Sequence, residues 1–487
     1  MAYVFGDGYD CYAATADAIL GYWDSGATIG SISLSAGRFA GSQCVHFANA
    51  TASNMIKSSA VNDAIHHISC AFRQTATISG TTLGLYFQLT DVAANQCCIV
   101  FRSDGTILLT SATPGGTVLA TYAGAVTAVN TWFQFEFEVV INNTTGSFKV
   151  RKNGSTTDDH STTGINTRPG ANTYANKLTV GMQAAVNAQQ IDDLLWRSDA
   201  SGVPWCGDIR CYTRMPASDA AVQFARAPNP SLVSQTNAAG ASTTSKAANL
   251  GCMSAFTASF DGTITTGTVA VSVGATGNMK VAIYDAARAV VLATSSAVVN
   301  PVSGNNTFTL TAPLTVTKGT VYYLATDQDA TIVYNSTTGN FTFTTTYASF
   351  PAASPSTTGA SAAPTFVVSL VPTNAGLVNE TLQDGTTSYV YDSTVNDADF
   401  YTIAPIVVTP ISVVAVTTRG FLQKSDAGTR GAAVQLKSGA TTVTSTPTLL
   451  SSSFGWLWRT DLTDPNTTAA WTVAAVNNVT IGPKVTS

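Results

Sequence analysis

Charged residues are scarce in this sequence. Asp, Glu, Lys and Arg together make up 10% of its 487 residues, well under the share of about 25% in typical soluble domains. Because solvent-facing helices normally carry many Glu and Lys side chains, this deficit argues against a helical protein. The formal net charge of -5 provides no basic surface, so we expect no nucleic-acid partner.

Long apolar runs and catalytic motifs are also missing. No apolar run reaches the length of about 18 residues that a membrane-spanning helix needs, so we expect no membrane insertion. The N-terminal stretch MAYVFGDGYDCYAATADAILGYW lacks the basic segment and apolar core of a signal peptide, so we do not expect export by the general secretory route. GxSxG, P-loop, HExxH and dinucleotide motifs do not occur. We therefore expect a protein that is not an enzyme.

The eight cysteines include no CxxC pair and the four histidines are scattered, which excludes the common zinc motifs. Two interpretations remain open. In the first, disulfides form after the protein leaves the cell, with Cys206 and Cys211 as the candidate local pair. In the second, the cysteines are buried free thiols, because free cysteine is among the most buried residue types.

The abundant residues favour strands. Val and Thr are branched at the β-carbon and suit a pleated sheet, and 38 Gly and 17 Pro divide the chain into short runs. In the clearest run, large apolar side chains occupy every second position, at Phe133, Phe135, Phe137 and Val139. The turn sequence Asn-Asn-Thr-Thr-Gly follows, and SFKVRKNG returns as a second strand. This pattern predicts an antiparallel hairpin with one apolar face.

A chain of this length exceeds one compact core, so several domains are expected. Composition and turn signals predict an all-β, multi-domain β-sandwich protein. We expect a jelly roll followed by two smaller β-sandwich domains. The predicted segments are a jelly roll at 1–228, a linker at 229–250, a middle sandwich at 251–350, a linker at 351–376 and a C-terminal sandwich at 377–487.

Three stretches of the N-terminal segment stand out, namely SAGRFAGSQCVHF, NTWFQFEFEVVINNTTGSFKVRKNG and IDDLLWRSDASGVPWCGDIRCYTRMPASDA. They resemble tailed-phage virion and tail proteins that begin with a concanavalin A-like (laminin-G-like) domain of the lectin/glucanase fold. In the last segment, LVNETLQDGTTSYVYDSTVNDADFY, KSDAGTRGAAVQLKSG and TDPNTTAAWTVAAVNNVTIGPKV resemble the C-terminal half of the same proteins. The resemblance covers about 330 of the 487 residues. The middle segment looks like an inserted module similar to carbohydrate-binding sandwich domains.

This resemblance implies a structural component of a bacteriophage virion, in a tail fibre or other appendage or in a capsid decoration. The implied partners are other virion proteins, further copies of the chain in a homo-oligomer, with a trimer favoured, and a host cell-surface glycan. The implied location is the released particle, after assembly in the host cytoplasm. Two alternatives stay open: a dedicated carbohydrate-binding adhesin that acts as the receptor-binding protein, and a polysaccharide-degrading enzyme.

Aromatic side chains are the usual platforms on which sugar rings stack, and the sequence offers six candidates. They are Trp205, Tyr212, Tyr322, Tyr323, Trp456 and Trp458. The alternative for each is packing in a sandwich core, where aromatic residues supply much of the buried area.

Adjacent aspartates are the candidate metal ligands. Laminin-G-like domains often bind calcium at their rim, so the resemblance suggests Asp192 or Asp193 as a calcium ligand. Because neighbouring residues on a strand point to opposite faces, we expect the two carboxylates to diverge. The alternative is that one caps a loop or pairs with Arg197 or Arg210. No other cofactor is expected, and Asp208 is expected to form an ion pair or hydrogen bond with a half-buried partner.

Glu136 and Glu138 are the candidate catalytic pair of an enzyme in this fold, since residues two apart on a strand share a face. The alternating phenylalanines turn toward the core, so we expect both glutamates to face solvent, which argues against catalysis. His66 and His67 are adjacent and diverge on a strand, and no third ligand accompanies them, so we expect no metal there.

Overall fold

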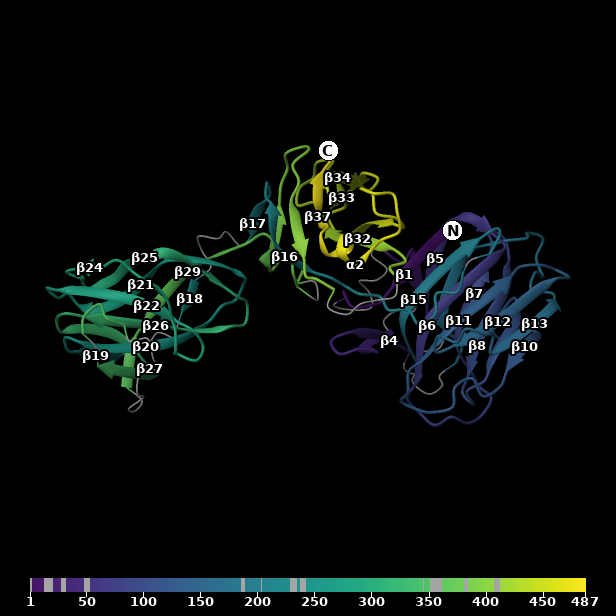
Figure 1. Ribbon diagram of the computed structural model, residues 1–487, viewed down its shortest axis with the longest axis horizontal. Helices are drawn as coiled ribbons and strands as arrows, with labels where there is room; N and C mark the ends of the chain where they lie inside the picture. The colour runs from purple at the N-terminus through teal and green to yellow at the C-terminus, as the bar shows by residue number, and fades with distance from the viewer. Residues whose placement is uncertain are drawn as a thin grey trace.

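The computed structural model describes residues 2–12, 21–27, 32–47, 53–184, 189–202, 204–227, 234–236, 242–344, 346–350, 361–380, 384–406 and 412–487. Nearly all regular elements in these ranges are strands, which confirms the all-β prediction (Figure 1). The helical elements described are the 3-10 turn η3 (Ala375–Leu377) and the short helix α2 (Val473–Asn477). No helix in the described part of the chain has the length and hydropathy that a membrane crossing requires.

The N-terminal domain is a sandwich of two antiparallel sheets that share one core (Figure 1). Among the described residues, the first sheet has the order β13 (His160–Ile165), β12 (Gly146–Lys152), β11 (Phe133–Val140), β6 (Ile65–Gln74), β15 (Gln189–Asp199), β4 (Gln43–Phe47) and β3 (Ile32–Ala36), with β1 (Ala2–Asp7) paired to β15. The second has the order β10 (Val118–Tyr122), β9 (Ile107–Ser111), β8 (Asn95–Arg102), β7 (Leu83–Thr90), β14 (Ala175–Met182), β5 (Asn54–Asp63) and β2 (Ser25–Ala27). Strands far apart in the sequence lie side by side, as in a jelly roll.

Alternating apolar residues of both sheets fill the core of this sandwich. The predicted hairpin is confirmed, because β11 and β12 pair from Phe135 opposite Lys152 to Val140 opposite Ser147. Phe135 and Phe137 are fully buried, and their ring centroids lie 5.8 Å apart. Burial of each aromatic side chain removes on the order of 150–250 Å² from water, so this strand contributes strongly to the stability of the sandwich.

The middle domain is a second antiparallel sandwich with its own core of buried aliphatic and aromatic side chains. Its path in the described chain runs β18 (Ser234–Thr236), β29 (Phe366–Pro372), β21 (Gly262–Val273), β27 (Ile332–Thr344), β20 (Leu250–Thr257), β26 (Val321–Gln328), β22 (Asn278–Tyr284) and β23 (Val291–Thr294), joined at its sides by β19 (Ser242–Lys246), β24 (Val298–Val299), β25 (Gly304–Val316) and β28 (Ser361–Pro364). Strands β18 and β19 lie in the predicted linker 229–250, and β28 and β29 lie in the predicted linker 351–376. Both linkers therefore contain strands of this sandwich, which extends the domain in both directions.

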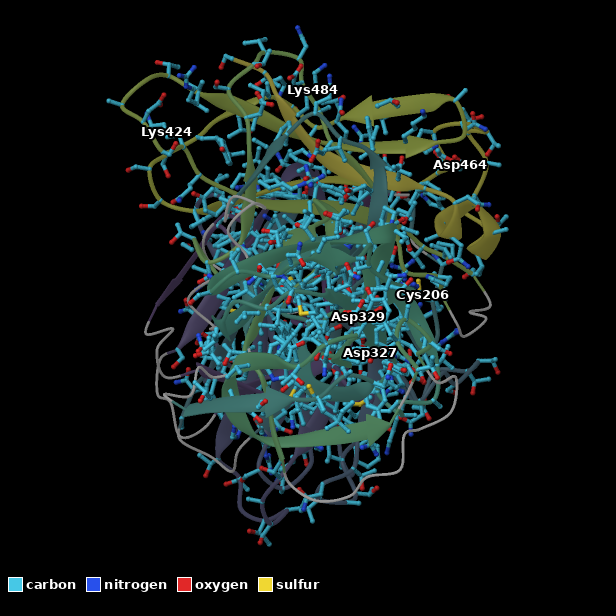
Figure 2. The ribbon with its side chains drawn as sticks, turned by 90° about the vertical axis from the view of Figure 1, so that its left-hand side faces the viewer. Cys206, Asp327, Asp329, Lys424, Asp464 and Lys484 are labelled. Atoms are coloured by element: carbon cyan, nitrogen blue, oxygen red, sulfur yellow. The ribbon has the colours of Figure 1, made fainter. Side chains whose placement is uncertain are left out.

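The C-terminal domain takes strands from both sides of the middle sandwich. Its described elements are a sheet in the order β16 (Pro216–Ala221), β31 (Phe400–Ile403), β37 (Thr480–Val485), β33 (Gly431–Ser438) and β34 (Thr441–Thr444) with β35 (Thr448–Leu449) beside β33, a ribbon of β17 (Ala225–Ala227) and β30 (Tyr389–Tyr391), and a ribbon of β32 (Val416–Leu422) and β36 (Gly455–Asp461). Because β16 and β17 pair with β31 and β30, residues 216–227 belong here and not to the jelly roll predicted at 1–228. The middle sandwich is thus inserted into the C-terminal domain. Lys424, Lys484 and Asp464 lie at separate places around this domain (Figure 2).

One ribbon of the C-terminal domain is anchored in the N-terminal core. Arg419 of β32 lies over the ring of Tyr22 at 3.7 Å and forms an ion pair with Asp7, from Nη2 to Oδ1 at 3.4 Å. Trp456 of β36 belongs to the N-terminal core cluster. Asp7 is fully buried and also accepts hydrogen bonds from the Tyr12 hydroxyl at 2.7 Å and from Nε1 of Trp23 at 2.9 Å. The two domains therefore share a buried, largely satisfied polar cluster.

Candidate functional site

A half-open pocket of about 240 Å³ lies at the edge of the N-terminal sandwich. Three segments line it: the residues that follow β1, the loop between β3 and β4, and the segment that follows β15. The lining residues are Asp10, Ala40, Gly41, Ser42, Arg210, Cys211, Tyr212, Thr213 and Met215. This combination of one aromatic ring, charged groups of both signs and a hydroxyl group is typical of a polar-ligand site.

The loop wall is held by a tight turn. Ser42 donates its backbone N–H to the carbonyl of Phe39 at 3.1 Å, and its hydroxyl accepts the N–H of Phe39 at 3.0 Å. Gly41 adopts a φ of +81°, which favours glycine because it has no Cβ. The turn sequence Gly-Arg-Phe-Ala-Gly therefore fixes Phe39 beside the pocket mouth.

Arg210 is the exposed cation of the pocket. Its Cζ lies 3.7 Å from the ring centroid of Phe39 and 4.0 Å from that of Tyr212. Both distances lie well within the limit of about 6 Å for a cation–π contact. Within the described residues Arg210 forms no ion pair, so its N–H donors stay available to a ligand.

Asp10 supplies the negative charge of the pocket. Its Oδ1 accepts the backbone N–H of Gln43 at 2.7 Å, which fixes the carboxylate against β4. Burial raises the pKa of Asp10 to about 6, because desolvation penalises the charged form more than the hydrogen bonds favour it. Asp10 can therefore accept hydrogen bonds from ligand hydroxyl groups, and it holds a proton at mildly acidic pH.

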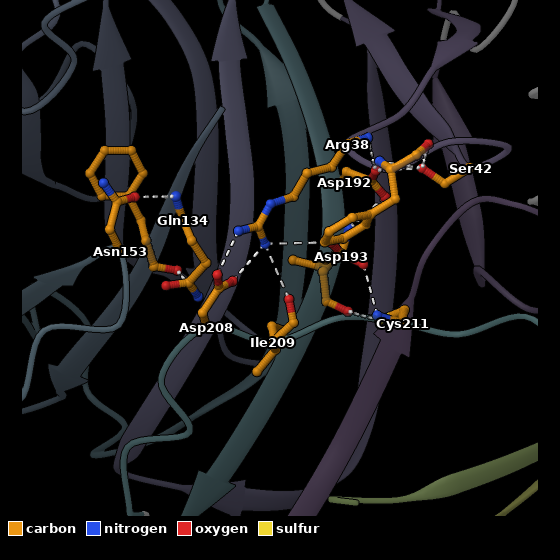
Figure 3. Close-up of polar contacts among 12 residues, drawn as sticks. Arg38, Ser42, Gln134, Asn153, Asp192, Asp193, Asp208, Ile209 and Cys211 are labelled. Carbon is orange, nitrogen blue, oxygen red and sulfur yellow. Dashed lines mark hydrogen bonds and ion pairs between the residues drawn. The ribbon is translucent and has the colours of Figure 1, made fainter. Parts of the chain in front are cut away.

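Behind the pocket, Arg38 holds three aspartates in place (Figure 3). Its Nη1 and Nη2 each donate to Asp208 at 2.6 Å, its backbone N–H donates to Asp192 Oδ2 at 2.7 Å, and its Nη1 lies 3.8 Å from Asp193 Oδ2. The predicted ion pair of Asp208 with a half-buried partner is confirmed, because the Arg38 side chain is 15% exposed.

The expected divergence of Asp192 and Asp193 is wrong. Asp193 has a φ of +50°, and the register between β15 and β6 shifts between Asp192 and Leu195. This bulge brings both carboxylates toward Arg38. Asp192 caps the β3–β4 loop by accepting the Arg38 N–H, as one alternative predicted, and Arg38 takes the place of the predicted ion-pair partners Arg197 and Arg210. Burial raises the pKa of Asp193, and the neighbouring charge of Asp192 raises it further.

The aspartates do not fit the calcium site that the resemblance suggests. A calcium ion takes six to eight oxygen ligands, whereas here a guanidinium group and backbone N–H groups point at the carboxylates. Within the described part of the chain, no group of three or more acidic, His or Cys side chains is arranged to hold a metal.

The structure corrects the expectation that Glu136 and Glu138 face solvent. Glu136 is 1% exposed and pairs with Nη2 of Arg197 at 2.9 Å, and it accepts the N–H of Cys206 at 2.8 Å. Glu138 bonds Nε2 of His67 at 3.0 Å, and its pKa is lowered to about 2, chiefly by that hydrogen bond. The segment after β15 covers Glu136, which stabilises its attachment by accepting the N–H groups of Cys206 and Gly207, whereas Glu138 pairs with Lys149 of the neighbouring strand β12. His67 is thus part of this ionic network.

The six aromatic candidates lie in different places. Tyr212 lines the pocket. Trp205 is half-buried, with its ring centroid 4.3 Å from Cζ of Arg151. In the middle domain, Tyr322 is 7% exposed in the core, and Tyr323 packs against a smaller buried cluster that includes Tyr284 and Phe343. Trp456 is in the N-terminal core, and the ring centroid of Trp458 lies 4.3 Å from Nζ of Lys57. Of the six, the structure therefore brings Tyr212 into the pocket.

All eight cysteines are free in the structure, so the Cys206–Cys211 disulfide is not formed. Each of the two makes its own contact instead. The N–H of Cys206 donates to Glu136, while the N–H of Cys211 donates to Asp193 Oδ1 at 2.7 Å. Burial raises the pKa of the Cys211 thiol well above its usual value, which makes it unreactive.

Sequence patterns alone did not indicate Asp10, Phe39 and Arg210 as site residues. Phe39 lies in SAGRFAGSQCVHF and Arg210 in the segment GDIRCYTRM, both quoted above for their resemblance to phage proteins. The available signal was that two separated stretches carry the resemblance. Each of them supplies part of the pocket lining. Asp10 lies outside both stretches, and its sequence surroundings carry no such signal.

No family model and no curated protein matches the sequence. Among solved structures, the chain is similar to the carbohydrate recognition domain of Emp46p in its metal-free form, with 9% identity, 36% of this chain and 87% of that chain covered, and a TM-score of 0.25. It is also similar to a conserved carbohydrate esterase of the Shiga toxin-encoding bacteriophage phi24B, with 14% identity, 36% and 89% covered, and a TM-score of 0.28. A third similarity is to the catalytic domain of a glycoside hydrolase family 131 protein from Coprinopsis cinerea, with 12% identity, 43% and 98% covered, and a TM-score of 0.30. Similarities this weak carry no argument about function.

Proposed function

We propose that this chain is a structural component of a bacteriophage virion whose N-terminal sandwich binds a host-surface glycan in the pocket lined by Asp10, Arg210 and Tyr212. The observation that carries the glycan-binding part is the arrangement of the pocket. An aromatic ring, an exposed guanidinium and a carboxylate line one half-open hollow. A sugar offers C–H faces for the ring and hydroxyl groups for the polar side chains.

The virion part rests on the sequence resemblance. Two of the resembling stretches supply most of the pocket lining, so they carry both parts of the proposal, while Asp10 lies outside them. A shallow site of this size binds one sugar weakly. Copies of the chain in a homo-oligomer, a trimer by resemblance, would raise the effective affinity on a glycan-covered cell without new contacts.

The binding test uses the full chain and polysaccharides from the surface of candidate host bacteria, measured by isothermal titration calorimetry. The Tyr212→Ala variant is expected to weaken binding about tenfold, because loss of a stacked ring costs about 1 kcal/mol or more. Tyr391→Ala is the matched control, since Tyr391 is 53% exposed on the C-terminal domain. Equal affinity of wild type and Tyr212→Ala would count against the pocket.

Particle location has its own test. Cryo-electron microscopy of the virion is expected to show the chain on a tail appendage or on the capsid, with the pocket open to solvent. A pocket closed by a neighbouring virion protein would refute the glycan role and leave the structural one. Particles that lack the chain altogether would refute the virion proposal.

One observation favours an enzyme as the second candidate. The raised pKa of Asp10, in a pocket, is a property of a general acid. A polysaccharide-degrading enzyme would release new reducing ends from the bound polysaccharide, and Asp10→Asn would abolish that release. Binding without release by the wild-type chain supports the non-enzymatic proposal.

A further inference from the structure

We infer that the glycan bound in this pocket carries a carboxylate, as uronic and sialic acids do, and that Arg210 recognises it. This inference rests on the proposed function and adds the chemical class of the ligand. The juxtaposition that carries it is an exposed guanidinium, fixed against two aromatic rings and without a carboxylate partner among the described residues.

The two arginines beside Phe39 differ in how their donors are used. Arg38 donates both Nη groups to Asp208, donates again to the carbonyl of Ile209 at 3.3 Å, and is 15% exposed (Figure 3). Among the described residues, Arg210 has ring contacts with Phe39 and Tyr212 and no ion pair. Arg38 therefore has a structural role, whereas the donors of Arg210 remain for a ligand.

Stacking prepares Arg210 for a planar anion. A guanidinium presents its N–H donors in the plane of the group, in a fork that matches the two oxygens of a carboxylate. The rings of Phe39 and Tyr212 lie 3.7 and 4.0 Å from its Cζ and restrict its rotation, so less side-chain entropy is lost when the ligand binds. Neutral sugars bind such a fork less tightly than a carboxylate, because their hydroxyl oxygens carry no charge to complement the guanidinium.

Asp10 sets the orientation of the ligand. A carboxylate on the sugar is repelled by Asp10 and attracted by Arg210, while sugar hydroxyl groups donate well to Asp10. The two charged groups on the pocket lining therefore favour one pose, in which the acid group of the sugar meets Arg210. Tyr212 lies beside Arg210 and offers its ring to the same sugar residue.

The test measures binding of the full chain to oligogalacturonate, hyaluronan and oligosialic acid fragments, and to the same fragments after reduction of their carboxyl groups to hydroxymethyl groups. At least one acidic fragment is expected to bind at least about tenfold more tightly than its reduced form. Arg210→Gln is expected to remove that difference, and Arg210→Lys to restore part of it. Arg430→Gln is the control, because Arg430 is an exposed cation on the C-terminal domain paired with Asp426.

The outcomes separate this inference from the proposed function. Equal binding of acidic and reduced fragments, or an unchanged preference in Arg210→Gln, overturns the inference and leaves glycan binding in place. Tighter binding of a sugar phosphate than of any carboxylate also overturns it, because the site would then select phosphate. No binding of any neutral or acidic glycan, including the host polysaccharides, refutes the proposed function itself. Circular dichroism of each variant confirms that the sandwich is folded.

Discussion

Replacing Arg419 by Met is expected to destabilise the contact between the N-terminal and C-terminal domains. The substitution leaves Asp7, which is fully buried, without its cationic partner at 3.4 Å. Removing one partner of a buried ion pair typically costs about 3–5 kcal/mol, because the other charge stays desolvated. Asp7 keeps the donors of Tyr9, Tyr12 and Trp23, so we expect the lower end, about 3 kcal/mol. Met preserves part of the apolar contact with Tyr22.

The assay is urea unfolding followed by tryptophan fluorescence, since Trp23 and Trp456 both lie at this contact. A thermodynamic cycle adds Asp7→Asn and the double variant. The double variant should lose less than the sum of the single losses, because no charge is then left unpaired. Arg430→Gln, which removes an exposed pair, should leave the midpoint unchanged. A loss under about 1 kcal/mol in Arg419→Met, or additive single losses, would refute the reasoning.

Three further predictions concern the N-terminal sandwich. Glu136→Ala should lower the free energy of unfolding in urea by about 3–5 kcal/mol, because Arg197 would remain buried without its carboxylate partner. A decrease below about 0.5 kcal/mol would mean that Glu136 faces solvent. The pKa of Asp10 in the folded state is raised from 3.8 to about 6, so between these two pH values the folded state holds a proton that the unfolded state has lost. The free energy of unfolding should therefore fall by about 2–3 kcal/mol as the pH rises from about 4 to about 6. Asp10→Asn should remove this slope, and an unchanged pH profile would contradict the raised pKa. Because Cys206 and Cys211 are free, adding dithiothreitol should not shift the unfolding midpoint, whereas a structural disulfide would lower stability on reduction by about 2–4 kcal/mol.

The sequence predicted those elements whose burial pattern is local. The strand with Phe133, Phe135 and Phe137 alternates with a period of two, and its partner follows after a short turn. Both facts are visible within about twenty residues of sequence. The all-β class followed in the same way, from composition and short apolar runs. Such features do not depend on which distant segment covers them.

The remaining features depend on distant segments. Glu136 has the alternation of an exposed residue, but the segment that contains Cys206 folds back over it and supplies donors from 70 positions away. The divergence expected of Asp192 and Asp193 assumed a regular strand, and the bulge that removes it has no signature in composition. The strands Ser234–Thr236 and Ser242–Lys246 contain small polar residues without alternation, so they resemble loops in sequence. In the candidate site, Tyr212 could be named from its residue type, whereas Arg210 required its contact with Phe39.

The insertion of the middle sandwich has a mechanical consequence. The chain leaves the C-terminal domain after β17 and returns to it at η3, where Asn374 and Ala375 donate their backbone N–H groups to the Asp219 carboxylate of β16. A tension applied to the middle sandwich therefore divides between two chain segments, one that continues from β17 and one that η3 attaches to β16. The pull is passed to β16 and β31, which are paired in the main sheet of the C-terminal domain. A domain joined through a single linker would place the whole load on one strand, whereas here two neighbouring strands share it.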